Sequence, residues 1–375
     1  MHDSLSTSGK EMPRALAFDV APLLLVGILA TVAAVTGPGW SQRIAALPWI
    51  ISLVVVGMPH GAADLALSRG AFRGWTLCGV WVAYLAAMVS VAVVLLGASR
   101  MALIIFAAMS CWHFGAARRA SAGERLAGGA SLWGIVAHGC VVLAMPLAAW
   151  PAATRDAATD LVTLVAGHQA ATAVVTETEV RTAGLVLAAL TVLAGAAAGV
   201  ASAGDPETRR DWRHGVLELA VIAGLGWFTE PLFSVGLYFL VWHSWRQMEP
   251  LAASLMGASP GSWSRIGRAV VRVHRDALPL LVPAWILILV AWWRLAPGHG
   301  FRELALVSIA AYLVVTPAHE ILGDLVHRTL RGRDRPAASR ARQAAARPVS
   351  RRWAAGPTVY EAATSRKAPI LRNFS

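Results

Sequence analysis

The sequence is poor in charge. Only 14% of its 375 residues are Asp, Glu, Lys or Arg, whereas a soluble domain carries about 25%. Hydrophobic residues make up 57% of the chain, and apolar runs of roughly 20 residues, the length that crosses a bilayer, recur along it. This composition excludes an ordinary soluble domain. It predicts an all-α fold, a polytopic integral membrane bundle of helices.

Cysteine is also scarce. Cys78, Cys111 and Cys140 lie scattered in apolar segments. Three cysteines at this spacing exclude a disulfide framework and a cysteine-based zinc site. We expect them to be buried side chains that fill space in the core.

Negative charge is in the minority, with 21 acidic against 33 basic residues and a net charge of +12. A basic chain can bind nucleic acid, but much of this excess lies in a C-terminal tail that contains Arg328, Arg331, Arg333, Arg335, Arg340, Arg342, Arg347, Arg351 and Arg352. Such a tail is typical of the cytoplasmic side of a membrane protein. Anionic lipid headgroups are a sufficient partner for it. We therefore expect no nucleic-acid partner.

Hydropathy predicts about ten transmembrane helices, within a range of eight to ten, at 15–36, 44–67, 74–97, 101–117, 128–150, 183–203, 214–228, 231–247, 277–296 and 302–325. The chain then divides into a cytoplasmic N-terminal segment (1–14), a transmembrane domain with the candidate site (15–325) and a basic tail (326–375), which we expect to be irregular from about residue 333. Arginines concentrate in alternate loops. This asymmetry predicts a multi-pass protein of the cell membrane with both termini in the cytoplasm.

Three local features refine this topology. Pro231 predicts a break between the seventh and eighth spans, because proline cannot continue a helix without losing a hydrogen bond. The loop 151–182 is long enough for a small extracytoplasmic cap. The segment before the ninth span predicts an interfacial helix with a basic face, since its arginines recur at helical spacing: Arg265, Arg268, Arg272 and Arg275.

Histidines fall within the predicted spans, where an ionisable residue is costly and indicates function. His60, His113, His243 and His319 each lie within about two turns of the inner end of a span, and these four spans run in the same direction. One imidazole from each of four helices therefore lies at a common depth. Neutral imidazole is the commonest metal ligand, and an all-histidine site suits iron, copper, zinc or nickel. His138 lies mid-span on a helix of the opposite direction, so we interpret it as structural.

Polar and aromatic residues accompany these histidines. Asp64 and Gln247 stand four residues after His60 and His243, so each shares a helix face with an imidazole that it could orient. Asp64 could equally face water at the inner surface. The nearby rings are an interfacial belt or the wall of a site for a long apolar substrate. The belt is the simpler interpretation of any single ring, and the candidate wall is Trp112, Phe114, Tyr238, Phe239 and Trp242.

Four strings, "GMPHGAADL", "CWHFG", "GLYFLVWHSWR" and "TPAHEIL", span residues 57 to 323. In this order they resemble the histidine motifs of the Brp/Blh family of bacterial and archaeal β-carotene dioxygenases. The resemblance implies a membrane enzyme whose non-haem iron(II) is held by histidines. It implies that the enzyme splits the central double bond of β-carotene with O₂ into two retinal molecules, often for a rhodopsin. His60, His113 and His243 match the family's iron ligands, and Asp64 matches the aspartate of the first motif.

The chain departs from the family pattern in three places. Gln247 stands where the family has a second histidine, and Ala318 separates Pro317 from His319. The acidic residue that often follows "HFG" is replaced by alanines. The fourth ligand could therefore be His319, Gln247 or water.

Two other classes of protein compete with an iron-dependent dioxygenase. A membrane di-metal desaturase or hydroxylase needs about eight histidines in clustered H-x₃-H or H-x₂-H-H boxes, and the sequence contains no such box. A carotenoid or retinal carrier, or a transporter, would need the histidines only for structure. Bound iron distinguishes the enzyme from the carrier.

Overall fold

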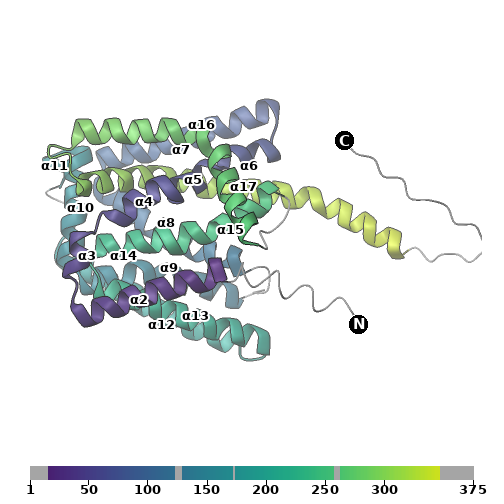
Figure 1. Cartoon of the computed structure of the whole chain (residues 1–375), viewed down its shortest axis with the longest axis horizontal. Coiled ribbons are helices and arrows are strands. Elements are labelled where there is room, and N and C mark those ends of the chain that lie inside the picture. Colours follow the sequence, from purple (N-terminus) through teal and green to yellow (C-terminus); the bar gives the residue numbers. More distant parts are fainter. Residues whose placement is uncertain (1–15, 123–128, 172–173, 257–261, 347–375) are drawn as a thin grey trace, which may run out of the picture. The chain divides into compact units, whose positions relative to one another are not determined.

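The computed structural model describes residues 16–122, 129–171, 174–256 and 262–346 (Figure 1). The chain divides into two units, Met1–Thr329 and Leu330–Ser375. In the described residues all regular structure is helical. In chain order the elements are η1 (Leu16–Val20), α2 (Ala21–Thr36), α3 (Gly39–Arg43), α4 (Leu47–Val55), α5 (Gly57–Ala62), α6 (Asp64–Ala71), α7 (Gly74–Gly97), α8 (Ser99–Ala122), α9 (Gly129–Ala149), α10 (Pro151–Ala166), α11 (His168–Ala171), α12 (Glu177–Ala201), α13 (Pro206–Phe228), α14 (Pro231–Leu237), η2 (Tyr238–Ser244), α15 (Trp245–Met256), α16 (Trp263–Leu295) and α17 (Phe301–Ala346). The elements η1 and η2 are π-helices.

Within the described residues, eight helical segments are long and apolar enough to cross a membrane. They are Leu16–Thr36, Leu47–Ala71, Gly74–Gly97, Ser99–Ala117, Leu132–Ala149, Glu177–Ala201, Trp263–Leu295 and Phe301–Val326. This confirms the all-α polytopic bundle at the lower end of the predicted range. Large apolar side chains remain exposed along α7 and α16, as expected of helices that face lipid.

Two of the ten predicted spans are not among these eight. One is α13, whose first turns are strongly charged, and the other runs without interruption through α14, η2 and α15. The second contains His243 and Arg246, which lower its hydropathy even though much of it is buried. The predicted break at Pro231 is confirmed, since α13 ends at Phe228 and Pro231 is the first residue of α14.

The second predicted span is divided into α4, α5 and α6. Pro59 lacks a backbone N–H and its ring collides with the carbonyl four residues earlier, so α4 cannot continue into α5. Val56, at the junction, leaves helical geometry with a φ of −141°. A side chain at Gly57 would collide with Ser52 Oγ and with the ring of Phe239. The break and this close approach together fix the position of α5.

The predicted interfacial helix and ninth span form one helix, α16, of 33 residues. The helix continues through Pro279 and Pro283, which follow its basic half, and at 1.5 Å per residue it is about 50 Å long. The last helix, α17, also runs further than expected. It reaches Ala346, because Ala and Arg are strong helix formers, whereas irregular chain was expected from about residue 333. The rest of the tail lies outside the described residues.

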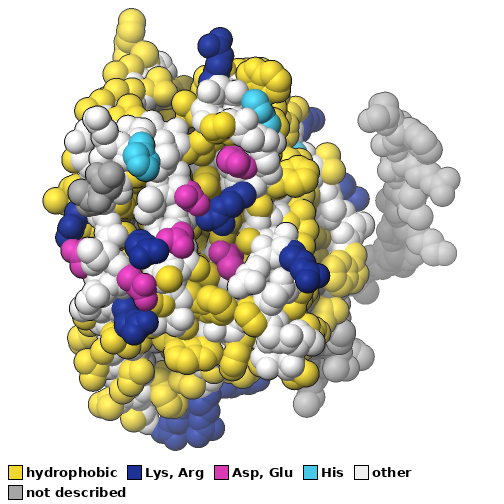
Figure 2. Space-filling view, turned by 90° about the vertical axis from the view of Figure 1, so that its left-hand side faces the viewer, with side chains coloured by type: hydrophobic (Ala, Val, Ile, Leu, Met, Phe, Trp, Pro, Cys, Tyr) yellow, Lys and Arg dark blue, Asp and Glu magenta, His cyan; other side chains and the backbone are white. Residues whose placement is uncertain are grey.

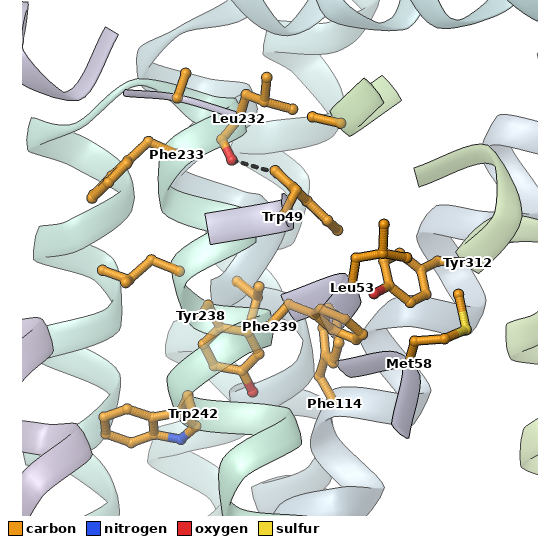
Figure 3. Close-up of a cluster of buried hydrophobic side chains, with 14 of the residues drawn as sticks. Trp49, Leu53, Met58, Phe114, Leu232, Phe233, Tyr238, Phe239, Trp242 and Tyr312 are labelled. Carbon is orange, nitrogen blue, oxygen red and sulfur yellow. Dashed lines mark hydrogen bonds between the residues drawn. The ribbon is translucent and has the colours of Figure 1, made fainter. Parts of the chain in front are cut away.

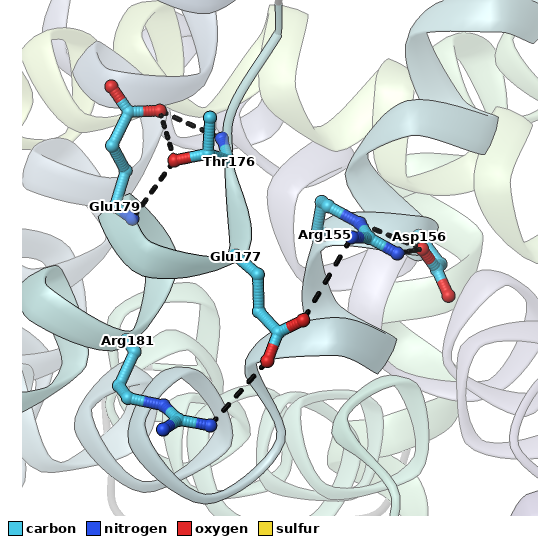
Figure 4. A network of polar contacts seen from close by, with 6 residues as sticks. All are labelled: Arg155, Asp156, Thr176, Glu177, Glu179 and Arg181. Atoms are coloured by element: carbon cyan, nitrogen blue, oxygen red, sulfur yellow. Dashed lines mark hydrogen bonds and ion pairs between the residues drawn. The ribbon is translucent and has the colours of Figure 1, made fainter.

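The predicted extracytoplasmic cap consists of α10 and α11, at the end of the bundle where Figure 1 also labels α3. Figure 2 views this end and shows acidic and basic side chains gathered at its centre with hydrophobic ones around them. Ion pairs link the helices here: Arg100 pairs with Glu179 at 2.6 Å and Arg302 with Asp160 at 2.7 Å. Figure 4 shows the neighbouring contacts among α10, α12 and the segment before α12.

The largest hydrophobic cluster lies between the helices that carry the candidate site (Figure 3). Trp49 is at its centre, and its indole Nε1 donates a hydrogen bond to the carbonyl of Leu232 at 2.7 Å. Its ring packs against Phe239 and Tyr312, with centroids 5.8 and 6.1 Å away. This cluster joins α4, α14, η2 and α17 around the histidines.

Candidate functional site

The structure brings the four predicted histidines together from four separate elements. His60 lies on α5, His113 on α8, His243 on η2 and His319 on α17. The ring centroids of His113 and His243 are 4.4 Å apart, and His60 lies 5.4 Å from His243. His319 lies 5.6 Å from His60 and 5.7 Å from His113. Positions separated by up to 259 residues in the chain, from 60 to 319, thus form one cluster of rings.

Hydrogen bonds at Nδ1 fix the tautomer of two of these rings. His60 Nδ1 lies 3.1 Å from the carbonyl oxygen of Val56, and His113 Nδ1 lies 2.6 Å from Glu320 Oε2. A carbonyl and a carboxylate accept only, so each Nδ1 must carry the proton. The Nε2 atom of each neutral ring then has a free lone pair, and metal-binding histidines commonly have this arrangement.

His243 has a different environment. Its Nε2 lies 2.9 Å from His113 Nε2, and its Nδ1 is buried without a hydrogen-bond partner. Since His113 Nε2 has a lone pair, the two rings form a hydrogen bond when His243 Nε2 carries the proton. The same separation suits two adjacent metal ligands, because nitrogens about 2.1 Å from one ion and 90° apart lie on the order of 3 Å from each other.

The four histidines are of a chemical type that binds metals, but their rings are not arranged around one coordination point. Among the described residues, no group of three or more His, Cys, Asp or Glu side chains is arranged to hold a metal ion. The four rings lie in one cluster, two of them have Nε2 lone pairs, and Nδ1 of His243 is buried without a partner. The donor set therefore fits a metal such as iron, and coordination requires the imidazoles to turn.

Close helix packing positions His113. Two residues after it, a side chain at Gly115 would collide with the backbone carbonyl of Ile135 on α9. Only glycine permits this approach, so α8 and α9 pack backbone against backbone beside the site. This close packing explains why the "CWHFG" string ends in a glycine.

Of the five predicted substrate-wall residues, Phe114 and Phe239 contact the histidine rings, and Tyr238 and Trp242 continue from Phe114 as a row of rings. Phe114, Tyr238, Phe239 and Trp242 are each less than 9% exposed. Phe239 stacks on His243 with centroids 5.5 Å apart, and Phe114 meets the same ring edge-on at 5.2 Å. Trp112 is 49% exposed, so its ring is not enclosed with the other four. It neighbours His113 in sequence, and adjacent helical residues point in different directions.

Asp64 and Gln247 are the two residues predicted to orient the histidines. Asp64 begins α6, but its side chain lies outside the described residues. Gln247 Nε2 donates a hydrogen bond to the carbonyl of Ala117 at 3.1 Å. In the described part of the chain this bond links α15 to α8, and no hydrogen bond joins Gln247 to His243.

Glu320 is the site residue that the sequence analysis missed. It directly follows His319, and its carboxylate holds the Nδ1 proton of His113. An acidic residue within an apolar span was the available signal. His138 lies elsewhere, with Nδ1 on the carbonyl of Gly134 at 3.0 Å and Nε2 3.5 Å from Glu218.

These features define the class of the protein: a polytopic helical membrane protein with a cluster of four histidines, three of which are buried. Residues 51–327 match the family model described as beta-carotene 15,15'-dioxygenase, a range that includes all four histidines. The chain belongs to this family of carotenoid-cleaving dioxygenases.

A similar curated protein is the probable beta-carotene 15,15'-dioxygenase Blh of Halobacterium salinarum. It is 28% identical over 318 residues, which cover 78% of this chain and 87% of that protein. No solved structure matches the chain.

Proposed function

We propose that this protein is an iron(II)-dependent dioxygenase that cleaves the central double bond of β-carotene or a related carotenoid with O₂. One oxygen atom goes to each carbon of the broken bond, so the products are two molecules of retinal. The observation that carries this proposal is the cluster of four imidazoles within the region that matches the family. When bound, iron supplies the activation of O₂ that no side chain can provide.

The proposed ligands are His60, His113, His243 and His319. The hydrogen bonds of His60 to Val56 and of His113 to Glu320 support coordination through Nε2. His319 is a better fourth ligand than Gln247 because its ring lies between 5 and 6 Å from those of His60 and His113. The amide of Gln247 is instead bonded to the backbone of α8.

The protein's own part in the reaction is to orient the substrate and exclude water. The proposed apolar wall consists of Phe114 and Phe239, which contact His243, and of Tyr238 and Trp242, which extend the row of rings from Phe114. A polyene can lie against such rings without desolvating polar groups. Both carotenoid and O₂ dissolve in the bilayer, so a site buried between membrane helices is accessible to both. No protein acid or base is required.

The proposed setting is the cell membrane, with both termini in the cytoplasm and the basic tail on anionic lipid. The arginine asymmetry between loops supports this orientation. Retinal as the product makes a retinal-binding rhodopsin a natural consumer.

Expression in a bacterium that accumulates β-carotene tests the activity. Wild-type protein should bleach the cells and produce retinal, and His243→Ala should leave them coloured. His168→Ala is the matched control, because His168 is exposed on α11 and takes no part in the cluster. Unchanged colour with the wild-type protein inserted and iron supplied would overturn the proposed activity.

A non-catalytic carotenoid or retinal carrier is the second candidate. It is favoured by one observation: the bond between His113 Nε2 and His243 Nε2 satisfies both atoms without a metal. Metal analysis of purified protein separates the two. About one iron per chain, lost in His60→Ala, supports the enzyme, whereas metal-free protein that binds carotenoid supports the carrier.

A further inference from the structure

The three residues that follow Ser244 attach the helix of His243 to three other elements. Trp245 Nε1 donates to the carbonyl of Ala17 on η1 at 2.8 Å. Arg246 Nη1 donates to Glu218 Oε1 on α13 at 2.8 Å. Gln247 is bonded to α8 as described above. Side chains at successive positions of a helix point in different directions, so together they restrain the helix on several sides.

Arg246 makes the most extensive of these attachments. Its second terminal nitrogen, Nη2, donates to Asp19 Oδ1 at 3.0 Å, and its guanidinium lies 5.2 Å from the ring centroid of Trp242. The Arg246 side chain is 11% exposed and that of Glu218 is 3% exposed. Burying such a pair costs desolvation energy, and an apolar pair could replace it without loss of stability. Its geometric role is therefore the better explanation for its presence.

His243 is the ring that needs such a restraint. His60 and His113 are each oriented by a hydrogen bond at Nδ1, whereas His243 Nδ1 is buried without a partner. Apart from the contact of its Nε2 with His113, its orientation depends on the rings of Phe239 and Phe114 and on the position of its own backbone. That backbone is the π-helix η2, which ends one residue after His243. A single π-helical turn within a longer helix is rare and is often found at functional sites.

We propose that Arg246, with Glu218 and Asp19, is the positioning residue of His243. It holds the end of η2 so that His243 Nε2 faces His113 Nε2. The part of this inference that concerns metal rests on the proposed function, but the restraint on η2 does not.

Two measurements on the full-length protein in detergent test the proposal. The first is titration with Co²⁺ alone, followed by its ligand-field absorption, which reports both affinity and coordination geometry. The second is hydrogen exchange of peptides that cover residues 238–248. Neither depends on turnover of carotenoid.

Arg246→Met keeps the apolar stem near Trp242 but removes both ion pairs. It should weaken Co²⁺ binding by about 10- to 100-fold, the range for losing an outer-shell group. It should also alter the absorption spectrum and speed exchange at 238–248. Arg246→Lys should fall between wild type and Arg246→Met, because a single ammonium cannot reproduce the guanidinium fork. Arg272→Met is the matched control, since Arg272 forms an exposed ion pair with Asp276 on α16.

Glu218→Gln tests whether the residues act as a unit. Combined with Arg246→Met, it should add little to the effect of the single variant, because each change breaks the same pair. If Arg246→Met fails to fold, Asp19→Asn tests the positioning role instead. It weakens only the ion pair of Arg246 with the half-exposed Asp19. Wild-type Co²⁺ affinity together with wild-type exchange in these variants would overturn the positioning role. If wild-type protein binds no metal, the proposed iron site is overturned. The hydrogen-exchange measurements would then still test whether Arg246 restrains η2.

Discussion

This protein has two polar regions, one exposed at an end of the bundle and one largely buried at the histidine cluster. At the end of the bundle that carries α10 and α11, the ion pair of Arg181 with Glu177 joins side chains that are 58% and 44% exposed (Figure 4). At the histidine cluster, the pair of His113 with Glu320 joins side chains that are 9% and 25% exposed. Water screens the first pair and can replace its hydrogen bonds. In the second, a lost partner leaves a buried group unsatisfied. Substitutions of similar chemistry should therefore have very different effects in the two regions.

The largest effect should come from the rings themselves. His319→Ala should reduce both iron content and retinal formation by more than the roughly 100-fold that loss of an outer hydrogen bond can cost. Gln247→Ala should have a much smaller effect, because its amide is bonded to Ala117. Iron analysis and product assays of the two variants side by side measure this. The reverse order of effects would make Gln247 the fourth ligand.

Loss of the carboxylate beside His113 should have the next largest effect. Glu320→Gln keeps the size of the side chain but weakens the bond to His113 Nδ1, which at 2.6 Å is short and charge-assisted. We expect iron affinity to fall by about 10-fold in Glu320→Gln and up to about 100-fold in Glu320→Ala. Asp324→Asn, four residues later on the exposed side of α17, is the control. Equal affinity in all three variants would show that Glu320 does not orient His113.

These two predictions also mark the limit of the sequence analysis. Composition and hydropathy were enough for the helical membrane bundle, and the positions of four histidines within their spans indicated a common depth. The bond between His113 and Glu320 joins positions 207 residues apart, and it depends on how α8 and α17 rotate against each other. Hydropathy carries no information about that rotation. For the same reason the sequence could not separate buried Phe114 from exposed Trp112.

The helix break at α5 gives a smaller effect, on stability rather than chemistry. Gly57→Ala would push a methyl group into Ser52 Oγ and the ring of Phe239. Overpacking of this kind costs about 1–3 kcal/mol. Gly61→Ala on the same helix has no heavy atom within 4 Å of the added methyl group and should be close to neutral. Thermal unfolding in detergent compares the two, and equal melting temperatures would contradict the close approach of α5 to η2.

The smallest effect should come from the end of the bundle that carries α10 and α11. Arg181→Ala removes the ion pair with Glu177, whose nitrogen–oxygen distance is 3.5 Å, from a half-exposed surface. Such pairs contribute about 0.2–1 kcal/mol and are weakened by salt. The melting temperature should therefore fall slightly at low salt and hardly at all in 1 M NaCl, with iron content unchanged. A large loss of iron in Arg181→Ala would mean that the two polar regions are coupled through the bundle, and the contrast between them would no longer hold.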